Sequence, residues 1–365
     1  MSQNKVDYAS AGVDISAGNL AVEMIKEHAA RTFNANVLCG LGSFASFYDL
    51  TSIMENYRHP VLVQSTDGVG TKIVVTRMSG DYTTVGRDLV SACANDIAVH
   101  GAVPLTFLDY IANDKLEPTV VASIVKGICD ACQEEGICLV GGETAEMPGT
   151  YLPGEHDLVG FVTGVVERDR IVNGAHVQKG DTVLAVGSTG LHTNGFSLAR
   201  KVLFQVGGLT LDDPVGTGNS VPAVTVGQAL TAVHANYVRG IQALLSSGIT
   251  VKSMAHITGG GLLENVPRVV PTHLSTVFWP ETWDRPPIFD LIQRTGTITD
   301  QEMYRTFNMG IGLVVIVGAD EEQSALDTMR NCFKQPVYHV GTVISGDGQT
   351  LIGGFNTAVD TGRRL

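Results

Sequence analysis

The sequence lacks the long apolar segments of membrane and exported proteins. No run of about eighteen apolar residues occurs along its 365 positions, and residues 1–14 contain no apolar stretch flanked by basic side chains. Such segments are required for a membrane-spanning helix and for a secretory signal peptide. We therefore expect a cytoplasmic protein with no membrane partner.

Basic residues are also scarce. The chain has 24 Lys and Arg against 37 Asp and Glu, which gives a formal net charge of −13. Proteins that bind the nucleic-acid backbone need a positive surface, so a nucleic-acid partner is not expected. An anionic nucleotide can still bind where a helix N-terminus or a divalent cation offsets the repulsion at one site.

Cysteine is sparse too, since six residues in so long a chain are too few for a disulfide framework. Cys129 and Cys132 form a C-x-x-C pair, but no second pair follows at the spacing of a zinc site. Cys132 instead continues an apolar stripe at helical spacing. We therefore predict that both thiols are reduced and pack in the core.

Glycine is abundant, with 42 residues, and 44% of the chain is hydrophobic. This composition is typical of a compact protein with many tight turns, and the length suggests two domains at about 150 residues each. The pattern predicts helices at 17–31, 85–99 and 118–135 and strands at 61–65, 105–111, 137–140 and 157–167.

A polar stretch at 168–181 is the predicted linker to a second domain. There we expect a strand at 182–186, a glycine-rich turn at 187–195, a helix from residue 196, a helix at 223–246 and a strand at 310–317. The tail after Ile344 has no periodicity and is predicted to be loosely ordered.

The segment from Thr66 to Lys72 reads TDGVGTK and follows a predicted strand. Its glycines allow close approach to an anion, its lysine supplies a positive charge, and Asp67 can hold Mg²⁺ through oxygen. The alternative is a simple turn with an exposed lysine. The candidate residues of the phosphate site are Asp67, Gly68, Gly70, Thr71 and Lys72.

The helix predicted at 85–99 carries Asp88, Ser91 and Asn95 on one face, with Asp96 beside them. Most of its other residues are apolar, and polar groups on a buried helix are costly unless they are paired or bind metal. A ligand site is therefore favoured, and a helix with one solvated face is the alternative.

A third acidic position follows the predicted strand at 137–140, where Gly141 and Gly142 precede Glu143. Glu143 is a candidate metal ligand on the same grounds as Asp67. Glu146, three residues further on, is better explained as a cap or turn residue.

In the second half, glycine-rich loops carry the polar residues. His192 and Asn194 precede a predicted helix, the triplet Gly259, Gly260 and Gly261 follows His256, and Arg305 and Asn308 precede a buried strand. A structural role for His192 and a surface ion pair for Arg305 are the alternatives.

Together these motifs resemble the AIR synthetase family from about residue 6 to 345. The resemblance is carried by GVDI at 12–15, TDGVGTK, Asn95 with Asp96, LVGGETAEMPGTY, LHTNGFSLARKVL, HITGGGLLENVPRV and MYRTFNMGIG. The motifs DGVGTK, Asn-Asp and GGET are shared with a wider superfamily that includes selenophosphate synthetase and thiamine-monophosphate kinase. The remaining motifs are more specific to the cyclo-ligases.

The resemblance implies an α+β protein with two mixed α/β domains, whose N-terminal strands form a barrel at a homodimer interface. It implies an ATP-binding and dimerisation domain at 1–168, a substrate-binding domain at 169–345 and a tail at 346–365. The implied reaction is ATP-dependent closure of formylglycinamidine ribonucleotide to 5-aminoimidazole ribonucleotide in purine biosynthesis, through an iminophosphate and with release of ADP and phosphate.

By the same resemblance, Asp67, Lys72 and His192 are catalytic, and Mg²⁺ is held by Asp67, Asp96 and Glu143, with K⁺ as a further candidate ion. The implied ATP contacts are Lys26, Gly68, Gly70, Thr71, Lys72, Asp88, Asn95, Asp96 and Glu143. The implied substrate contacts are His192, Asn194, Gly259, Gly260, Gly261, Arg305 and Asn308.

Two other classes of function remain open from sequence. Selenophosphate synthetase is expected to carry a reactive cysteine or selenocysteine followed by lysine, whereas Cys39 is followed by Gly40. A catalytically silent nucleotide-binding protein would bind ATP but release no ADP when given the ribonucleotide.

Overall fold

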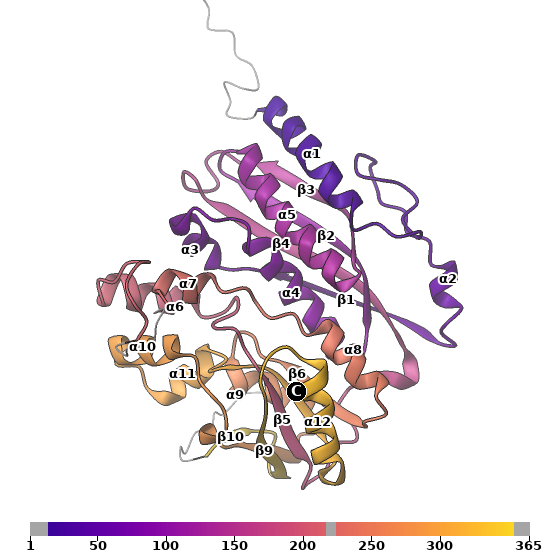
Figure 1. The fold of residues 1–365 in the computed structure, drawn as a ribbon, viewed down its shortest axis with the longest axis vertical. Helices are drawn as coiled ribbons and strands as arrows, with labels where there is room; N and C mark the ends of the chain where they lie inside the picture. The colour runs from indigo at the N-terminus through magenta and orange to yellow at the C-terminus, as the bar shows by residue number, and fades with distance from the viewer. Residues whose placement is uncertain (1–13, 217–223, 354–365) are drawn as a thin grey trace, which may run out of the picture. The chain divides into compact units, whose positions relative to one another are not determined.

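The computed structural model describes residues 14–216 and 224–353 and shows a mixed α/β protein (Figure 1). The chain divides into two compact units. The first comprises residues 1–94 and 104–165, and the second comprises 95–103 and 166–365. Among the described residues, no helix has the length and apolar character required to cross a membrane.

The first unit is built on a four-stranded sheet in the order β1-β4-β2-β3, in which β2 and β3 run parallel. The strands are β1 (Pro60–Gly68), β2 (Val103–Asn113), β3 (Cys138–Glu146) and β4 (His156–Glu167). The helices are α1 (Ile15–Ala30), α2 (Thr51–Met54), α3 (Lys72–Ser79), α4 (Val85–Ala98) and α5 (Pro118–Glu135).

Local signals explain where these helices begin and end. The Asp14 carboxylate accepts hydrogen bonds from the Ser16 and Ala17 amides at 2.9 and 3.1 Å and so caps α1. Helix α5 begins with Pro118 and ends at Gly136, whose φ of 73° lies in the left-handed region that glycine adopts easily. Cys129 and Cys132 are buried on α5, which confirms the prediction of core packing.

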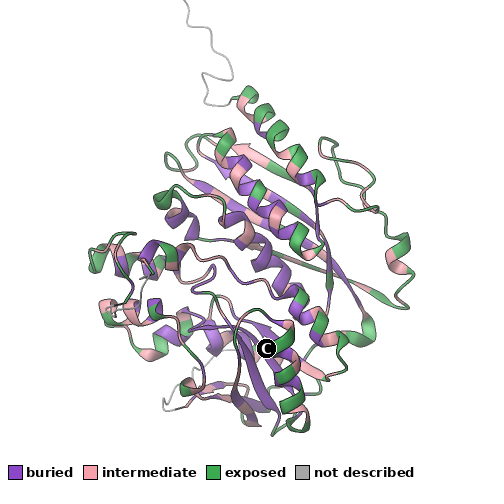
Figure 2. Ribbon diagram, in the orientation of Figure 1, coloured by how far each residue is buried: buried purple, intermediate pink, exposed green. Residues whose placement is uncertain are grey.

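The two faces of this sheet differ. On one face, Leu89 and Cys93 of α4 pack close to Phe107 of β2, near Gly160 of β4. On β1 the residues alternate between exposed and half-buried, and Leu62 keeps 60% of its surface exposed. Leu108 and Phe161 are exposed by 40% and 44%, and Figure 2 shows the exposed positions along the strands. The described sheet is open and forms no closed barrel.

Helices α4 and α5 approach each other closely. A Cβ atom on Gly86 would lie 2.1 Å from the Ile124 carbonyl oxygen, and one on Gly127 would lie 2.6 Å from the Thr83 carbonyl oxygen. Such distances are far below van der Waals contact. The packing of the two helices therefore requires glycine at both positions.

The second unit is built on a six-stranded sheet in the order β10-β7-β9-β5-β8-β6. Strand β10 runs parallel to β7, and the other neighbouring pairs of strands are antiparallel. The strands are β5 (Thr182–Gly187), β6 (Val251–His256), β7 (Leu274–Phe278), β8 (Ile311–Val317), β9 (Val337–Ser345) and β10 (Thr350–Ile352). Every residue of β8 is buried, so this strand forms the centre of the core.

Short helices precede and separate strands of this second sheet in the sequence. The α-helices are α6 (Phe196–Arg200), α7 (Val226–Thr231), α8 (Val238–Ser246), α9 (Gly261–Asn265), α10 (Pro287–Gly296), α11 (Asp300–Thr306) and α12 (Glu322–Cys332). A π-helix η3 (Lys201–Val206) follows α6, and the 3-10 turns are η2 (Arg168–Arg170), η4 (Val266–Val269), η5 (Pro280–Thr282) and η6 (Ala319–Glu321).

One prediction for the second half is wrong, and a second is wrong for the residues that the structure describes. The helix predicted at 223–246 is interrupted at residues 232–237, because the Asn95 side chain bonds the Ala235 carbonyl and the Tyr237 amide there. Residue 223 lies outside the described residues. The tail after Ile344 is ordered as far as β10, whose three residues are too few to show periodicity. Residues 354–365 lie outside the described part.

Candidate functional site

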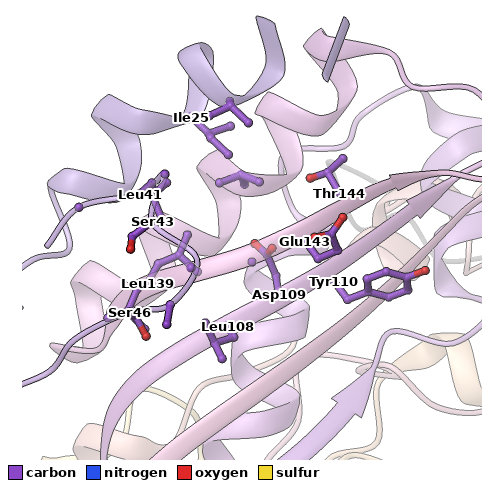
Figure 3. A pocket seen from close by; sticks show the side chains of 18 of the residues that line it. Ile25, Leu41, Ser43, Ser46, Leu108, Asp109, Tyr110, Leu139, Glu143 and Thr144 are labelled. Carbon is purple, nitrogen blue, oxygen red and sulfur yellow. The ribbon is translucent and has the colours of Figure 1, made fainter. Parts of the chain in front are cut away.

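A pocket in the first unit has a volume of about 840 Å³. It is bordered by α1, by the loop at residues 40–46, and by β2 and β3 (Figure 3). The loop contributes Gly40, Gly42 and the fully exposed Phe44, while β3 contributes Gly141 and Gly142. Because glycines lie on both sides, main-chain atoms are accessible to a ligand in this space.

Two carboxyl groups line this pocket. Tyr110 of β2 is paired in register with Glu143 of β3, and Asp109 is paired with Gly142, so the two acidic residues lie on adjacent strands (Figure 3). Glu143 is exposed, whereas Asp109 keeps only 8% of its surface. The predicted ligand Glu143 is therefore accessible from the pocket.

Asp109 was missed by the sequence analysis. Burial raises the pKa of its carboxyl group to about 7. A Cβ atom on Gly142 would lie 2.0 Å from the Asp109 Oδ1 atom, so the absence of a side chain at Gly142 makes room for this carboxyl group. The available signal was an acidic residue within the otherwise apolar strand predicted at 105–111.

The TDGVGTK segment joins β1 to α3. The Asp67 carboxylate accepts a hydrogen bond of 2.7 Å from the Gly68 amide, and Gly70 has a φ of 53°. Gly70 and Thr71 border a second cavity of about 320 Å³, together with Arg77 and Asp157. The turn therefore places main-chain groups and a carboxylate at the end of β1, as the sequence predicts.

Lys72 and Asp88 form a buried ion pair with an Nζ to Oδ2 distance of 2.8 Å, and neither side chain exposes more than 1% of its surface. Removing one partner of such a pair typically costs about 3–5 kcal/mol, because the other charge stays buried. The pair explains how the polar face of α4 is compensated. The contact of Lys72 with phosphate stays a prediction.

Lys26, the remaining predicted ATP contact in the first unit, lies on α1 and pairs with Glu23 of the same helix. Glu146 accepts hydrogen bonds from the Asp14 and Leu116 amides at 2.6 and 2.9 Å. It joins the start of α1 to the end of β3, which agrees with the structural role predicted for it.

In the second unit, the predicted substrate residues gather around residues 188–195. Asn308 is buried and donates to the Gly190 carbonyl at 2.8 Å, while its Oδ1 accepts from the Ser188 hydroxyl at 3.0 Å. A Cβ atom on Gly259 would lie 3.2 Å from the Asn194 Oδ1 atom, which places the two loops side by side. Asn308 therefore anchors the loop that carries His192 and Asn194.

The rest of the predicted set is less uniform. Gly260 and Gly261 have φ angles of 96° and 58°, and a Cβ atom on Gly261 would lie 2.1 Å from the Tyr304 carbonyl oxygen, so this turn requires glycine. Arg305 is exposed, and its Nε donates to Glu264 at 2.9 Å, which fits the ion pair considered as the alternative. Its contact with substrate stays a prediction.

Asn95 and Asp96 belong to the second unit. Asp96 Oδ1 lies 2.8 Å from Nδ1 of His256, and Nε2 of His256 lies 3.0 Å from Nε2 of His234. His192 stacks on His234 with ring centroids 4.0 Å apart. His234 was missed by the sequence analysis, because it lay inside a predicted helix, where a lone histidine gives little signal.

Comparison with known proteins places these features in a family. The sequence model of the AIR synthase related protein N-terminal domain matches residues 52–166, and that of the C-terminal domain matches residues 178–354. Hydrogenase maturation protein HypE in complex with ATP has a similar fold, with a TM-score of 0.64 at 18% identity, covering 93% of this chain and 91% of that one. Thiamine-monophosphate kinase from Stenotrophomonas maltophilia gives 0.67 at 17% identity, covering 91% and 96%.

Sequence relatives are much closer. The phosphoribosylformylglycinamidine cyclo-ligase of Caldanaerobacter subterraneus is 43% identical over 94% of this chain and 99% of its own length. That of Citrifermentans bemidjiense is 46% identical over 89% and 92%, and that of Nitrosococcus oceani is 44% identical over 98% and 96%. Relationship at this level extends over both units. The chain therefore belongs to the phosphoribosylformylglycinamidine cyclo-ligase family, within the AIR synthase related proteins.

Proposed function

We propose that this chain catalyses the ATP-dependent closure of formylglycinamidine ribonucleotide to 5-aminoimidazole ribonucleotide, with release of ADP and phosphate. The observation that carries the proposal is 43% identity over nearly the full length of a cyclo-ligase. The glycine-rich turn after Asp67, the carboxylate of Glu143 beside two glycines of β3, and the polar loops of the second unit supply groups of the right chemistry for a nucleotide and a polar ribonucleotide.

ATP is assigned to the first unit. Its pocket of about 840 Å³ is large enough for a nucleotide and offers backbone groups of two glycine-rich segments. Asp67 and Glu143 each offer carboxylate oxygen, which suits Mg²⁺. They lie on β1 and β3, the two edge strands of the first sheet, so they are not neighbours there, and of the two only Glu143 lines this pocket. Each is kept as a separate candidate ligand for an ion that would stabilise charge on the transferred phosphoryl group. Asp96 as a third ligand and K⁺ as an additional ion stay predictions.

The ring closure must remove the formyl oxygen, which is a very poor leaving group as hydroxide. In the proposed mechanism this oxygen attacks the γ-phosphorus of ATP and ADP departs. The neighbouring amidine nitrogen then adds to the activated carbon, phosphate leaves, and a proton is lost as the ring forms. His192 and Asn194, with Asn308 behind them, are assigned to holding the ribonucleotide for these steps.

Release of ADP on addition of formylglycinamidine ribonucleotide tests the activity. The substrate of thiamine-monophosphate kinase serves as the control in the same coupled assay. ADP release with this control but not with the ribonucleotide would refute the cyclo-ligase proposal. Binding of ATP with no release for any substrate would indicate a silent nucleotide-binding protein.

The phosphorylated intermediate has its own test. The formyl oxygen of the substrate is labelled with a heavy isotope, the reaction is run in unlabelled water, and the inorganic phosphate is analysed by mass spectrometry. The label is expected in the phosphate. If the oxygen label is found in the water and the phosphate is unlabelled, the mechanism is contradicted even if the overall reaction takes place.

We also propose a homodimer in which the first sheet pairs with its copy to form the predicted barrel. The support is the apolar character of exposed strand residues, with Leu62, Leu108 and Phe161 on β1, β2 and β4. Exposed apolar groups gathered on one sheet are typical of an interface. A reducing, cytoplasmic location is proposed as well, supported by six free cysteines.

A further inference from the structure

Three buried histidines of the second unit come from separate segments of the chain. His192 lies in the loop after β5, His234 lies between α7 and α8, and His256 ends β6. Their exposed fractions are 1%, 1% and 5%. Buried imidazoles must satisfy their ring nitrogens, so the proton on each ring is set by its neighbours.

The orientation of the Asn95 amide is fixed from both sides. Its Nδ2 donates to the Ala235 carbonyl at 2.9 Å, and its Oδ1 accepts from the Tyr237 amide at 2.8 Å. A carbonyl only accepts and a main-chain N–H only donates, so the two ends of this side chain cannot be exchanged. The group that Asn95 turns toward His256 is therefore an N–H donor.

This determines the tautomer of His256. Its Nε2 lies 3.4 Å from the Asn95 Nδ2 donor and must carry a lone pair, because a proton there would face another N–H. The ring proton is then on Nδ1, where it is donated to Asp96 Oδ1 at 2.8 Å. The carboxylate and the amide independently require the same tautomer.

The tautomer of His234 follows. Its Nε2 lies 3.0 Å from the lone pair on His256 Nε2, so it must be the protonated nitrogen. Its Nδ1 is left as an acceptor, 3.4 Å from the Thr193 hydroxyl oxygen. The hydrogen bonds thus run in one direction, from Thr193 to His234, from His234 to His256 and from His256 to Asp96.

The same three rings each place a nitrogen within 4.8 Å of the other two, which is close enough to consider a shared metal ion. A ligand nitrogen, however, directs its lone pair in the plane of its ring, and the planes of His192 and His234 are stacked within 18° of parallel. Two stacked planes cannot both contain one nearby ion. The Thr189 amide, which donates to His192 Nε2 at 3.2 Å, also occupies one of the candidate ligand atoms. The hydrogen-bond chain is therefore the better account of the cluster.

We propose that His234 is a positioning residue for the substrate loop, acting through Thr193 and held in one tautomer by Asp96 and His256. The proposal rests on the assignment of loop 190–195 to the ribonucleotide. The Thr193 hydroxyl directs its proton to His234, and the side-chain amide of Asn194 donates to the Thr193 hydroxyl oxygen at 3.4 Å. The chain of hydrogen bonds therefore orders Thr193 and Asn194, the two residues that follow His192.

The local backbone needs such support. His192 has a φ of 61°, which is uncommon and unfavourable for a residue with a side chain. The loop is also held by the hydrogen bond from Asn308 to the Gly190 carbonyl and by a hydrogen bond from the Thr189 hydroxyl to the Val233 carbonyl. His234 adds a contact from the adjacent segment, so it couples the interruption between α7 and α8 to the geometry of the loop.

The first test is spectroscopic and does not depend on activity. Protein labelled with ¹⁵N in histidine is examined by long-range ¹H–¹⁵N correlation at neutral pH without ligands, and signals are assigned with His234→Gln and His256→Gln. His256 is expected as the Nδ1–H tautomer and His234 as the Nε2–H tautomer. The opposite tautomer at either ring overturns the proposal.

The second test is kinetic. The amide of asparagine overlays Nδ1 of histidine, and that of glutamine overlays Nε2, so His234→Asn keeps an acceptor for Thr193 while His234→Gln loses it. We expect His234→Gln and Thr193→Val each to raise KM for the ribonucleotide about tenfold, as for one lost hydrogen bond. KM for ATP should not change, and His234→Asn should give a smaller rise.

The double variant completes a double-mutant cycle of Thr193 and His234. If His234 acts through Thr193, Thr193→Val with His234→Gln is no worse than either single change. The positioning role would be refuted if the increases in KM of the two single variants multiply in the double variant, or if His234→Asn and His234→Gln raise KM equally. Thermal melts of each variant exclude unfolding as the cause. Wild-type protein that shows the expected tautomers but no cyclo-ligase activity would refute the proposed function and leave the hydrogen-bond chain intact.

Discussion

At the scale of single residues, Asp67 is the sharpest test of the metal site. Asp67→Asn removes the negative charge but keeps an oxygen acceptor for the Gly68 amide. We expect turnover to fall by a factor on the order of 100 or more at saturating Mg²⁺, with the melting temperature nearly unchanged. Steady-state ADP release and calorimetry measure the two effects.

The matched control is Asp327→Asn, which alters an exposed aspartate on α12. It should leave both turnover and melting temperature close to those of the wild type. Full activity of Asp67→Asn would remove Asp67 from the proposed Mg²⁺ ligands.

Asp109 gives a prediction about pH. Its pKa of about 7 in the folded chain exceeds the value of about 3.9 for an exposed aspartate. Between these values the folded protein holds a proton that the unfolded chain has released, so the stabilisation is complete below about pH 4 and is lost as the pH rises through 7. Asp109→Asn should therefore raise the free energy of unfolding most at alkaline pH, by up to about 4 kcal/mol at pH 8.

Urea denaturation of the metal-free protein at pH 5 and pH 8 measures this difference. The gain should be clearly smaller at pH 5, where the wild-type carboxyl group is still protonated in the folded state. An equal gain at both pH values would show that the carboxyl group does not titrate between them.

At the scale of secondary structure, the contact between α4 and α5 depends on glycine. Gly86→Ala places a Cβ atom 2.1 Å from the Ile124 carbonyl oxygen, which forces the helices apart. We expect a loss of about 1–3 kcal/mol in the free energy of unfolding.

Gly18→Ala on α1 is the comparison, because among the described residues no atom outside the backbone of its own helix and its chain neighbours lies within 4 Å of the added Cβ. Alanine there should stabilise the helix by about 0.5–1 kcal/mol. Denaturant titration of both variants decides the matter. A neutral Gly86→Ala would mean that the helices can separate without cost.

The elements most accurately predicted from sequence are those whose apolar pattern persists over several turns or residues. Helix α5 has the predicted bounds, and α4, β4 and β8 differ by only one or two residues. The segment at 223–246 was predicted wrongly because its interruption depends on Asn95, which is more than a hundred positions away in the chain. Local periodicity contains no information about such a contact.

The candidate site shows the same contrast between residues that local sequence indicates and residues whose role depends on distant contacts. Asp67 follows an apolar run and lies at the end of β1, as predicted, whereas Glu143 was predicted after a strand at 137–140 and lies inside β3, which continues to Glu146. Asp109 and His234 could not be identified as site residues, because their significance depends on Gly142 and His256 in other segments. The burial of Lys72 against Asp88 was also outside the reach of sequence, since a lysine after a glycine-rich turn is usually accessible.

At the scale of the whole molecule, the exposed apolar positions on the first sheet predict self-association. Sedimentation at micromolar concentration should show a dimer. Leu62→Asp, at a strand position with 60% exposure, should shift the protein to monomer by placing a charge in the interface.

Leu152→Asp is the matched control, because Leu152 has 68% exposure but lies outside the strands. It should leave the dimer intact. A wild-type monomer, or equal dissociation by both substitutions, would exclude the sheet as the interface.

The position of β10 has a consequence for synthesis on the ribosome. The first unit is complete in sequence once residue 165 has been made, whereas the second sheet needs residues 350–352 to cover the edge of β7. Domains commonly fold as they emerge, N-terminal first. Residues 95–103 are translated early but belong to the second unit. They therefore cannot reach their final packing until the strands of the second sheet have been translated.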